Sequence, residues 1–282
     1  MRNFLFVPGN SPKMLSSANF LGSDAVVIDL EDAVAPGEKD AARLLVRNAI
    51  LTFRYRVTFG VRINSLDTLY WEKDLQAILP LNPDFIMLPK TADDTSIFRL
   101  ETAMATIEAD HGVSQPVPVI ALLETAEGIE NAYRIAKASK RVQALFLGAE
   151  DLTANLCAIR TKEGSEILYS RSRLVNAARA AGIDAYDTPF TGVEDLAGLE
   201  KDARFARQLG FTGKAAINPQ HIEGINLAFT PTEAEIQYAR EVLSIIEKAE
   251  KEGLGAVALH GKMIDAPIVA RAKQILQTAR DL

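Results

Sequence analysis

Short apolar runs recur along most of the chain, and each ends at polar or turn-forming residues. Each run has the length and the composition of a buried β-strand. Eight strands are predicted in this way: Phe4–Val7, Ala25–Leu30, Val57–Ile63, Phe85–Leu88, Val117–Leu123, Val142–Leu147, Ile183–Asp187 and Lys214–Ile217.

Segments with apolar residues at helical spacing lie between these runs. The predicted helices are Ser11–Asn19, Glu38–Leu51, Leu69–Ile78, Thr95–Asp110, Gly128–Ser139, Glu166–Ala181 and Val193–Leu209. This alternation of strands and helices, without consecutive hairpins, is typical of parallel βα units, and eight such units close into a TIM (β/α)8 barrel. An open doubly wound sheet is the alternative, but its first turn typically carries G-x-G-x-x-G, whereas this chain has P-G-N-S-P.

The residues after the eighth strand are not needed to close the barrel. Thr232–Lys251 is predicted to be a long amphipathic helix, and a last helix runs through Ala279. We therefore expect a barrel domain over residues 1–230 and a C-terminal helical extension over residues 231–282. The extension could pack on its own barrel, cover the barrel mouth or reach a neighbouring subunit.

Composition narrows the class of protein. The net charge of −6 over 282 residues gives no basic footprint for nucleic acid. No signal peptide is recognisable, and no apolar stretch is long enough to span a membrane. The single cysteine, Cys157, fits a reducing compartment, so a cytoplasmic location is expected.

Two carboxylates mark the most informative strand ends. Glu124 follows the fifth predicted strand in A-L-L-E-T, and Asp151 follows the sixth in G-A-E-D-L. Because they lie one strand–helix–strand unit apart, a parallel sheet would place both at the same end of neighbouring strands. Two hard oxygen ligands without softer neighbours suit Mg²⁺. The alternative is that both residues only cap the helices that follow them.

Further polar residues gather at the predicted carboxyl ends of the strands. They are Asp29, Glu31, Asp32, Arg62, Asn64, Lys90, Glu150, Asp187 and Asn218. In a barrel these ends ring the mouth that holds the active site. Capping alone does not explain such agreement across several strands, so the pattern favours a metal site.

Two cations are expected to serve the same mouth. Arg62 presents a planar fork that suits a substrate carboxylate, although an internal salt bridge to Asp29, Glu31 or Asp32 is the alternative. Lys90 adds positive charge for substrate binding, with a Schiff-base lysine as its less favoured interpretation.

The general base is the least determined role. The three histidines, His111, His221 and His260, lie away from strand ends, which disfavours a zinc site and leaves the base to a carboxylate. Asp265 is the candidate, but it stands two residues before Pro267 and could cap the last helix. Spacing alone favours that structural role.

Taken together and in order, the motifs are specific. They run L-F-V-P-G-N, D-L-E-D-A-V, V-R-I-N-S-L-D, L-P-K-T, A-L-L-E-T, L-G-A-E-D-L, A-A-R-A-A-G-I-D-A-Y-D-T, L-G-F-T-G-K-A-A-I-N-P and G-K-M-I-D-A-P. Over nearly its whole length the chain resembles the citrate lyase beta subunit family, within the wider group of malyl-CoA and citramalyl-CoA lyases.

The resemblance implies a barrel whose C-terminal extension is exchanged between the subunits of a trimer or larger oligomer. It implies that Glu124 and Asp151 bind Mg²⁺ and that Arg62 holds the keto-acid carboxylate. It also implies that Asp265 reaches a neighbour's active site as the acid/base, which reverses the preference drawn from spacing.

The implied reaction cleaves a 3-hydroxy-3-carboxy acyl thioester, citryl-carrier protein or citryl-CoA, to oxaloacetate and an acetyl thioester. R-T-K-E-G-S-E and G-K-M-I-D resemble the subunit that works in a citrate lyase complex. A-L-L-E-T and G-A-E-D-L also occur in freestanding enzymes, so a citramalyl-CoA or malyl-CoA lyase releasing pyruvate or glyoxylate is the alternative. Two further hypotheses are a non-catalytic subunit that docks a carrier protein and an aldolase acting on free keto acids.

Overall fold

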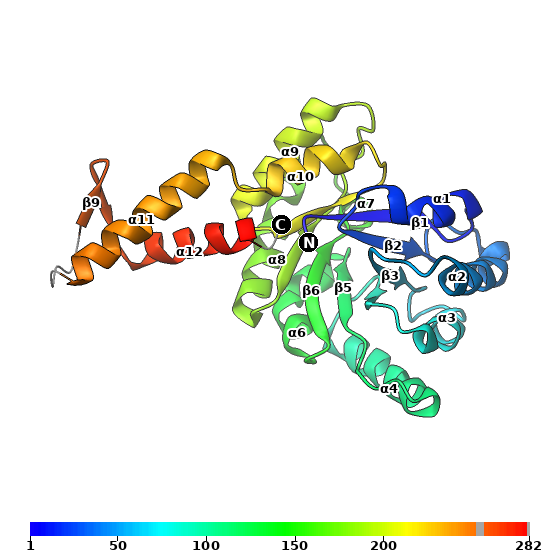
Figure 1. Cartoon of the computed structure of the whole chain (residues 1–282). Coiled ribbons are helices and arrows are strands. Elements are labelled where there is room, and N and C mark those ends of the chain that lie inside the picture. Colours follow the sequence, from blue (N-terminus) through cyan, green and yellow to red (C-terminus); the bar gives the residue numbers. More distant parts are fainter. Residues whose placement is uncertain (252–256, 281–282) are drawn as a thin grey trace. The chain divides into compact units, whose positions relative to one another are not determined.

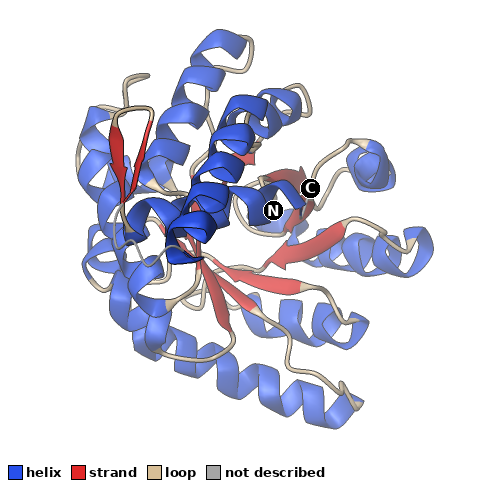
Figure 2. Cartoon of the chain, turned by 60° about the vertical axis from the view of Figure 1, so that its left-hand side comes forward, coloured by secondary structure: helices blue, strands red, loops and turns tan. Residues whose placement is uncertain are grey.

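The computed structural model describes residues 1–251 and 257–280. Eight parallel strands form a closed barrel in sequence order, and β1 pairs with β8 to close it (Figures 1 and 2). The strands are β1 (Asn3–Pro8), β2 (Ala25–Asp29), β3 (Thr58–Arg62), β4 (Phe85–Leu88), β5 (Val119–Leu123), β6 (Val142–Leu147), β7 (Asp184–Asp187) and β8 (Gly213–Ala216). The predicted TIM barrel is therefore confirmed.

Helices connect successive strands and cover the outside of the barrel (Figure 2). They are α1 (Pro12–Ser17), α2 (Lys39–Phe53), α3 (Trp71–Ile78), α4 (Asp94–His111), α5 (Ala126–Glu130), α6 (Ala132–Lys137), α7 (Ala149–Asn155), α8 (Leu168–Ala181), α9 (Leu196–Leu209) and α10 (His221–Phe229). Short 3₁₀ turns adjoin several of them: Ala18–Phe20, Pro36–Glu38, Leu79–Leu81 and Ser165–Ile167.

The structure differs from the predicted helices in two ways. The helix predicted over 128–139 begins earlier and is divided at Asn131. The backbone of Asn131 is not helical, with φ −87° and ψ 3°. The sequence pattern did not predict α7 and α10, because seven and nine residues are too short to show a helical period.

The barrel interior is filled by alternate residues of the strands. Phe4, Phe85, Phe146 and Tyr186 form its aromatic centre, with Phe4 and Phe146 at a ring-centroid distance of 5.5 Å and an interplanar angle of 89°. This edge-to-face geometry is favourable for aromatic pairs. Phe6 packs against Phe146 next to this centre and lines the site described below.

The chain divides into two compact units, Met1–Asn226 and Leu227–Leu282. In the second unit, α11 (Glu233–Lys251) packs against α12 (Ala266–Arg280) around Ala239, Val242, Ile264 and Ala272. A hairpin of β9 (Val257–Leu259) and β10 (Lys262–Ile264) precedes α12. The hairpin, which was not predicted, turns at His260 and Gly261, whose φ values of 49° and 75° suit a two-residue primed turn.

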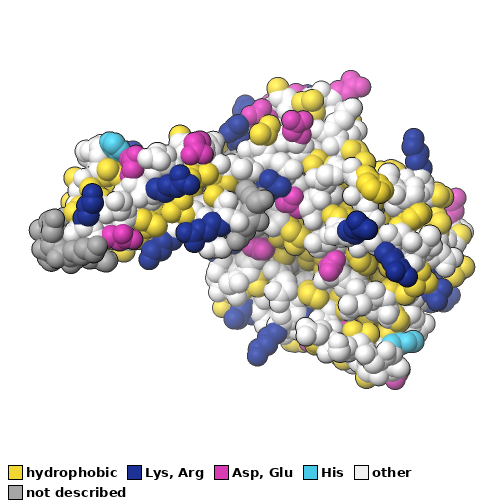
Figure 3. All heavy atoms as spheres, in the orientation of Figure 1, with side chains coloured by type: hydrophobic (Ala, Val, Ile, Leu, Met, Phe, Trp, Pro, Cys, Tyr) yellow, Lys and Arg dark blue, Asp and Glu magenta, His cyan; other side chains and the backbone are white. Residues whose placement is uncertain are grey.

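The surface carries charges of both signs. Figure 3 shows Lys and Arg side chains interspersed with acidic and apolar ones on the face in view. Among the described residues, no helix combines the length and apolar composition that crossing a bilayer requires.

Candidate active site

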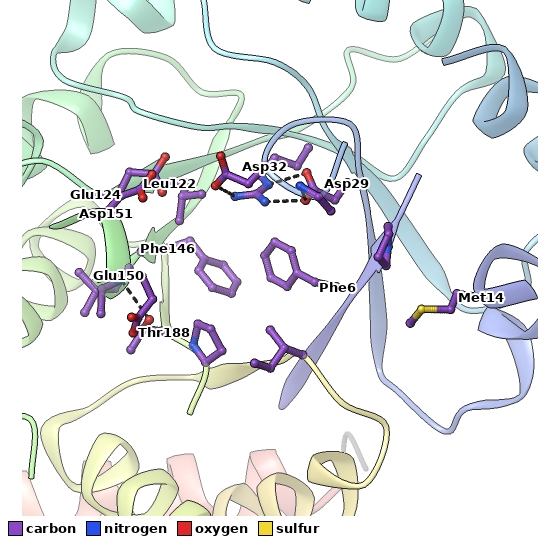
Figure 4. A pocket seen from close by; sticks show the side chains of 18 residues that line it. Phe6, Met14, Asp29, Asp32, Leu122, Glu124, Phe146, Glu150, Asp151 and Thr188 are labelled. Atoms are coloured by element: carbon purple, nitrogen blue, oxygen red, sulfur yellow. Dashed lines mark hydrogen bonds and ion pairs between the residues drawn. The ribbon is translucent and has the colours of Figure 1, made fainter. Parts of the chain in front are cut away.

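A cavity of about 450 Å³ opens at the carboxyl ends of the barrel strands. Arg62 and several acidic side chains line it, and the rings of Phe6 and Phe146 lie next to each other in it (Figure 4). The residues that line it are Phe6, Pro8, Met14, Asp29, Asp32, Ala33, Arg62, Leu122, Glu124, Phe146, Leu147, Gly148, Ala149, Glu150, Asp151, Thr188, Pro189 and Ile217.

Glu124 lies directly after β5 and is 3% exposed. Its Oε1 accepts a hydrogen bond from the backbone N–H of Lys90 at 2.7 Å. Burial raises the pKa of this carboxyl to about 8, although the nearby Arg62 opposes the rise, and the charges of Glu31 and Asp151 add to it. A buried carboxylate in this environment is strongly favoured by a neighbouring cation.

Asp151 lies in the first turn of α7, the helix that follows β6 after Gly148. Because β5 and β6 pair in parallel with Leu123 opposite Leu147, the two carboxylates follow neighbouring strands at the same end of the barrel, as predicted. The Asp151 side chain is 43% exposed, and its Oδ2 lies 3.8 Å from Lys90 Nζ. Both carboxylates line the cavity, and Figure 4 shows them side by side.

This donor set fits Mg²⁺. It consists of hard oxygen atoms, one carboxylate being buried and the other open to the cavity and therefore to water or substrate. Within residues 1–251 and 257–280, no group of three or more His, Cys, Asp or Glu side chains is arranged to enclose a metal ion. Such an enclosing set is what a structural zinc site would need.

Arg62, the last residue of β3, forms an internal ion pair with Asp29. Its Nε and Nη2 donate to the two carboxylate oxygens of Asp29 at 2.8 and 2.6 Å. The remaining nitrogen, Nη1, has only longer contacts, 3.3 Å to Glu31 Oε2 and 3.5 Å to Asp32 Oδ2. The salt bridge that was the alternative interpretation is present, while Arg62 also lines the cavity and lies over the Phe6 ring at 5.4 Å.

Lys90 follows β4 and lies among three carboxylates. Its Nζ donates to Glu31 Oε1 at 2.7 Å and is 3.9 Å from Asp32 Oδ1. Burial lowers the pKa of this ammonium, but the hydrogen bond and charge of Glu31 outweigh burial, so the net shift is upward. A protonated amine is not a nucleophile, which disfavours the Schiff-base interpretation.

Other residues predicted at the mouth have structural partners. Asn64 donates its side-chain amide to Asp74 at 2.7 Å, and Asn218 accepts a hydrogen bond from the backbone N–H of Gln220. Asp187 does not reach the mouth, so that expectation was wrong. Because Tyr186 points into the barrel, the next residue points outward to the helix layer, where Asp187 is fully buried.

Asp265 belongs to the second compact unit. Its Oδ1 accepts a hydrogen bond from the backbone N–H of Ile268 at 3.2 Å, which is the helix-capping contact that spacing alone predicts. The hydrogen bond occupies one carboxylate oxygen, and the assignment of Asp265 as acid/base stays a prediction.

Several lining residues were not predicted. The apolar wall formed by Phe6, Phe146 and Ile217, and the contacts of Gly148 and Thr188 described below, were absent from the predicted site. A glycine two residues before the Glu150–Asp151 pair and a threonine directly after Asp187 were the available signals.

Comparison with known proteins gives a consistent picture. A model of the HpcH/HpaI aldolase/citrate lyase family matches residues 2–219. Citrate lyase subunit beta of Leuconostoc mesenteroides subsp. cremoris is 41% identical, over 99% of this chain and 93% of that protein. L-malyl-CoA/beta-methylmalyl-CoA lyase of Cereibacter sphaeroides is 33% identical, over 98% and 93%.

Solved structures agree with these sequence matches. The crystal structure of CitE from Mycobacterium tuberculosis in complex with magnesium, acetoacetate and coenzyme A superposes with a TM-score of 0.83. It is 32% identical, and the match covers 99% of this chain and 98% of that one.

Proposed function

Because the chain belongs to the HpcH/HpaI aldolase/citrate lyase family, we propose that it is a magnesium-dependent carbon–carbon lyase. Its substrate is a 3-hydroxy-3-carboxy acyl thioester, citryl-carrier protein or citryl-CoA, and its products are oxaloacetate and an acetyl thioester. The observation that carries the proposal is the pair of carboxylates, Glu124 and Asp151, at neighbouring strand ends in the cavity.

The chain's own residues supply binding and charge balance for this reaction. Glu124 and Asp151 hold the metal. Arg62 binds a carboxylate of the substrate through Nη1, the guanidinium nitrogen that does not donate to Asp29. Lys90 keeps positive charge beside Glu31 and Asp151 and contributes to binding an anionic substrate. The Phe6 and Phe146 wall excludes water from one side of the reacting carbons.

The reaction requires one base and one acid. The substrate hydroxyl loses its proton, its oxygen becomes the ketone of oxaloacetate, and the bond to the carbon beside the thioester breaks. That electron pair enters the thioester as an enolate, which takes up a proton to give the acetyl group. When bound, Mg²⁺ acts as a Lewis acid that polarises the hydroxyl and the adjacent carboxylate of the substrate.

We assign the acid/base role to Asp265 of a neighbouring subunit in a homotrimer or larger ring, as the sequence resemblance implies. The assignment is tested by mixing two inactive variants, Asp265→Ala and Asp151→Asn, after dissociation. The Asp265→Ala subunit keeps an intact barrel, and the Asp151→Asn subunit keeps an intact C-terminal extension. In a randomly mixed ring, about one quarter of the sites combine this barrel with this extension. Recovery of that fraction of activity supports exchange, whereas continued inactivity places the acid/base elsewhere.

A substrate panel tests the reaction itself. The purified chain is incubated with citryl-CoA, (S)-citramalyl-CoA and malyl-CoA, and keto-acid release is measured with Mg²⁺ and with EDTA. Metal-dependent release that is lost in Asp151→Asn supports the lyase and ranks the acyl groups. If all three are inert, citryl-carrier protein is the next substrate, and inactivity there would favour a non-catalytic docking subunit.

The panel also covers the freestanding alternative. Citramalyl-CoA lyase of Rattus norvegicus is 32% identical over this whole chain, so release of pyruvate rather than oxaloacetate would move the assignment to that activity. The cytoplasm is the proposed compartment, in agreement with a single, unpaired cysteine.

A further inference from the structure

Helix α7, which carries Asp151, begins without a cap of its own. Its N-cap residue is Gly148, so no side chain is available there to accept a hydrogen bond from the first turn. A Cβ atom at this position would lie 2.6 Å from Glu124 Oε2 and 2.8 Å from Glu124 Cβ. The close packing of the buried carboxylate therefore requires glycine at 148 and removes the usual cap.

The missing cap comes from the next strand of the barrel. Thr188, directly after β7, accepts a hydrogen bond at its Oγ1 from the backbone N–H of Ala149 at 3.0 Å. On the other side, the Gly148 N–H donates to the carbonyl of Leu123 at 3.0 Å. The start of α7 is thus hydrogen-bonded to β5 through Gly148 and to the residue after β7 through Ala149. Ala149 lies two positions before Asp151.

Thr188 is itself fixed by buried charges. Lys214 Nζ donates to the Thr188 carbonyl at 2.7 Å and to Asp187 Oδ2 at 2.6 Å. Arg171 donates to both oxygens of Asp187, at 3.0 and 2.9 Å, and to Asp202 Oδ1 at 2.8 Å. We call Arg171, Asp187, Asp202 and Lys214 the buried charge cluster.

The buried charge cluster is a rigid support. The side chains of Arg171, Asp187 and Lys214 are fully buried, and Asp202 is 9% exposed. Removing any one of these side chains leaves a buried charge with less compensation in the interior, so the cluster resists displacement. Thr188 is also fully buried, which leaves its hydroxyl few alternatives to the Ala149 N–H.

We propose that Thr188 is a positioning residue for the metal-binding carboxylate Asp151, acting through the start of α7 and held in place by the buried charge cluster. The inference rests on the proposed function, because it assumes that Asp151 binds Mg²⁺. Thr188 is expected to fix the direction of the Asp151 side chain without contacting the metal.

The test replaces Thr188 with valine, which keeps the shape and removes the accepting oxygen. Binding of Mg²⁺ to the full-length protein is measured by titration calorimetry, and exchange of the α7 amides by hydrogen–deuterium exchange. Loss of an outer-shell partner typically costs about 10–100-fold in metal affinity. Thr188→Val is expected to lose at least about tenfold and to exchange faster at Ala149, and Thr188→Ser to restore most of both.

A matched control separates positioning from general weakening of the helix. Thr153 lies in the same helix, is 3% exposed, and donates its hydroxyl to the Ala149 carbonyl at 2.8 Å. Thr153→Val removes an equally buried hydroxyl without releasing the start of α7, so near wild-type Mg²⁺ affinity is expected.

The outcomes are distinguishable. Wild-type affinity in Thr188→Val, or an equal loss in Thr153→Val, would overturn the positioning role alone. Absence of Mg²⁺ binding in the wild-type protein would overturn the proposed function, and the inference with it.

Discussion

Lys90 holds Glu124 through its backbone, since the Lys90 N–H donates to Glu124 Oε1 at 2.7 Å. Its side chain turns instead to Glu31, at 2.7 Å, and lies 3.8 Å from Asp151. The backbone and the side chain of Lys90 therefore act on different parts of the site and can be separated by mutation.

Lys90→Met is expected to preserve metal binding and weaken substrate binding. The backbone hydrogen bond to Glu124 stays, while removal of a cation beside Asp151 reduces repulsion of Mg²⁺ and tightens it a few-fold. The KM for an anionic thioester should rise about tenfold or more, because a charged contact is lost. Calorimetry and steady-state kinetics check the two effects, and a marked loss of Mg²⁺ affinity would contradict this separation.

Gly148→Ala is expected to disable the site without unfolding the protein. The backbone at Gly148 has φ −106° and ψ 93°, which alanine adopts without strain, so the penalty comes from contacts of the added Cβ, chiefly with Glu124 and also with Leu122 Cδ1 at 3.3 Å. Displacement of Glu124 should weaken Mg²⁺ binding at least about tenfold. Gly37→Ala is the control, since a Cβ there meets no atom within 4 Å. Normal metal binding by Gly148→Ala would show that Glu124 can move freely.

Lys214→Met is expected to destabilise the fold. The change leaves Asp187 and Asp202 with less compensation in a buried setting, and breaking a buried pair costs about 3–5 kcal/mol. Urea denaturation measures the free energy of unfolding. The exposed Lys201→Met should change it by less than about 0.5 kcal/mol. Equal stability of the two variants would argue against a buried charge cluster.

The contribution of Glu166 is expected to depend on pH. Burial raises the pKa of Glu166, but hydrogen bonds from Thr161 and Arg160 outweigh it and lower the pKa from 4.5 to about 2. Because the folded-state pKa is the lower one, ionised Glu166 stabilises the fold above pH 4.5, and this stabilisation is lost as pH falls towards 2.

Thermal melts of the wild type and Glu166→Gln test this dependence. The wild type should melt at the higher temperature at pH 7, and the difference should shrink between about pH 4.5 and pH 2. A difference that persists unchanged to low pH would mean that ionisation of Glu166 is not its source.

Most of the fold followed from the sequence because each barrel strand is a short apolar run that ends abruptly. The predicted run Val142–Leu147 coincides with β6, and Phe85–Leu88 with β4. The two unpredicted barrel helices, α7 and α10, are too short for a periodic signal. The hairpin before α12 depends on positive φ values at His260 and Gly261.

The site was only partly predictable, because the sequence does not show which residues of a strand face into the barrel and which face outward. Glu124 stands directly after β5, and Asp151 stands in the first turn of α7, so the inward or outward direction of a strand residue does not decide whether they lie near the mouth. For Asp187 this inward or outward direction is decisive. Tyr186 faces into the barrel, so Asp187 faces outward, towards Arg171 and Lys214. The run D-A-Y-D-T does not by itself say which of its residues faces inward.

The cap that Thr188 gives to α7 links three positions in the evolution of this barrel. A serine or aspartate at 148 would cap the helix locally, but it would displace the carboxylate at 124. A descendant that lost the glutamate could regain a local cap, and position 188 would then be free to vary. We expect Glu124, Gly148 and Thr188 to be exchanged together rather than singly, so a barrel of this kind that carries a larger residue at 148 should also have abandoned the metal.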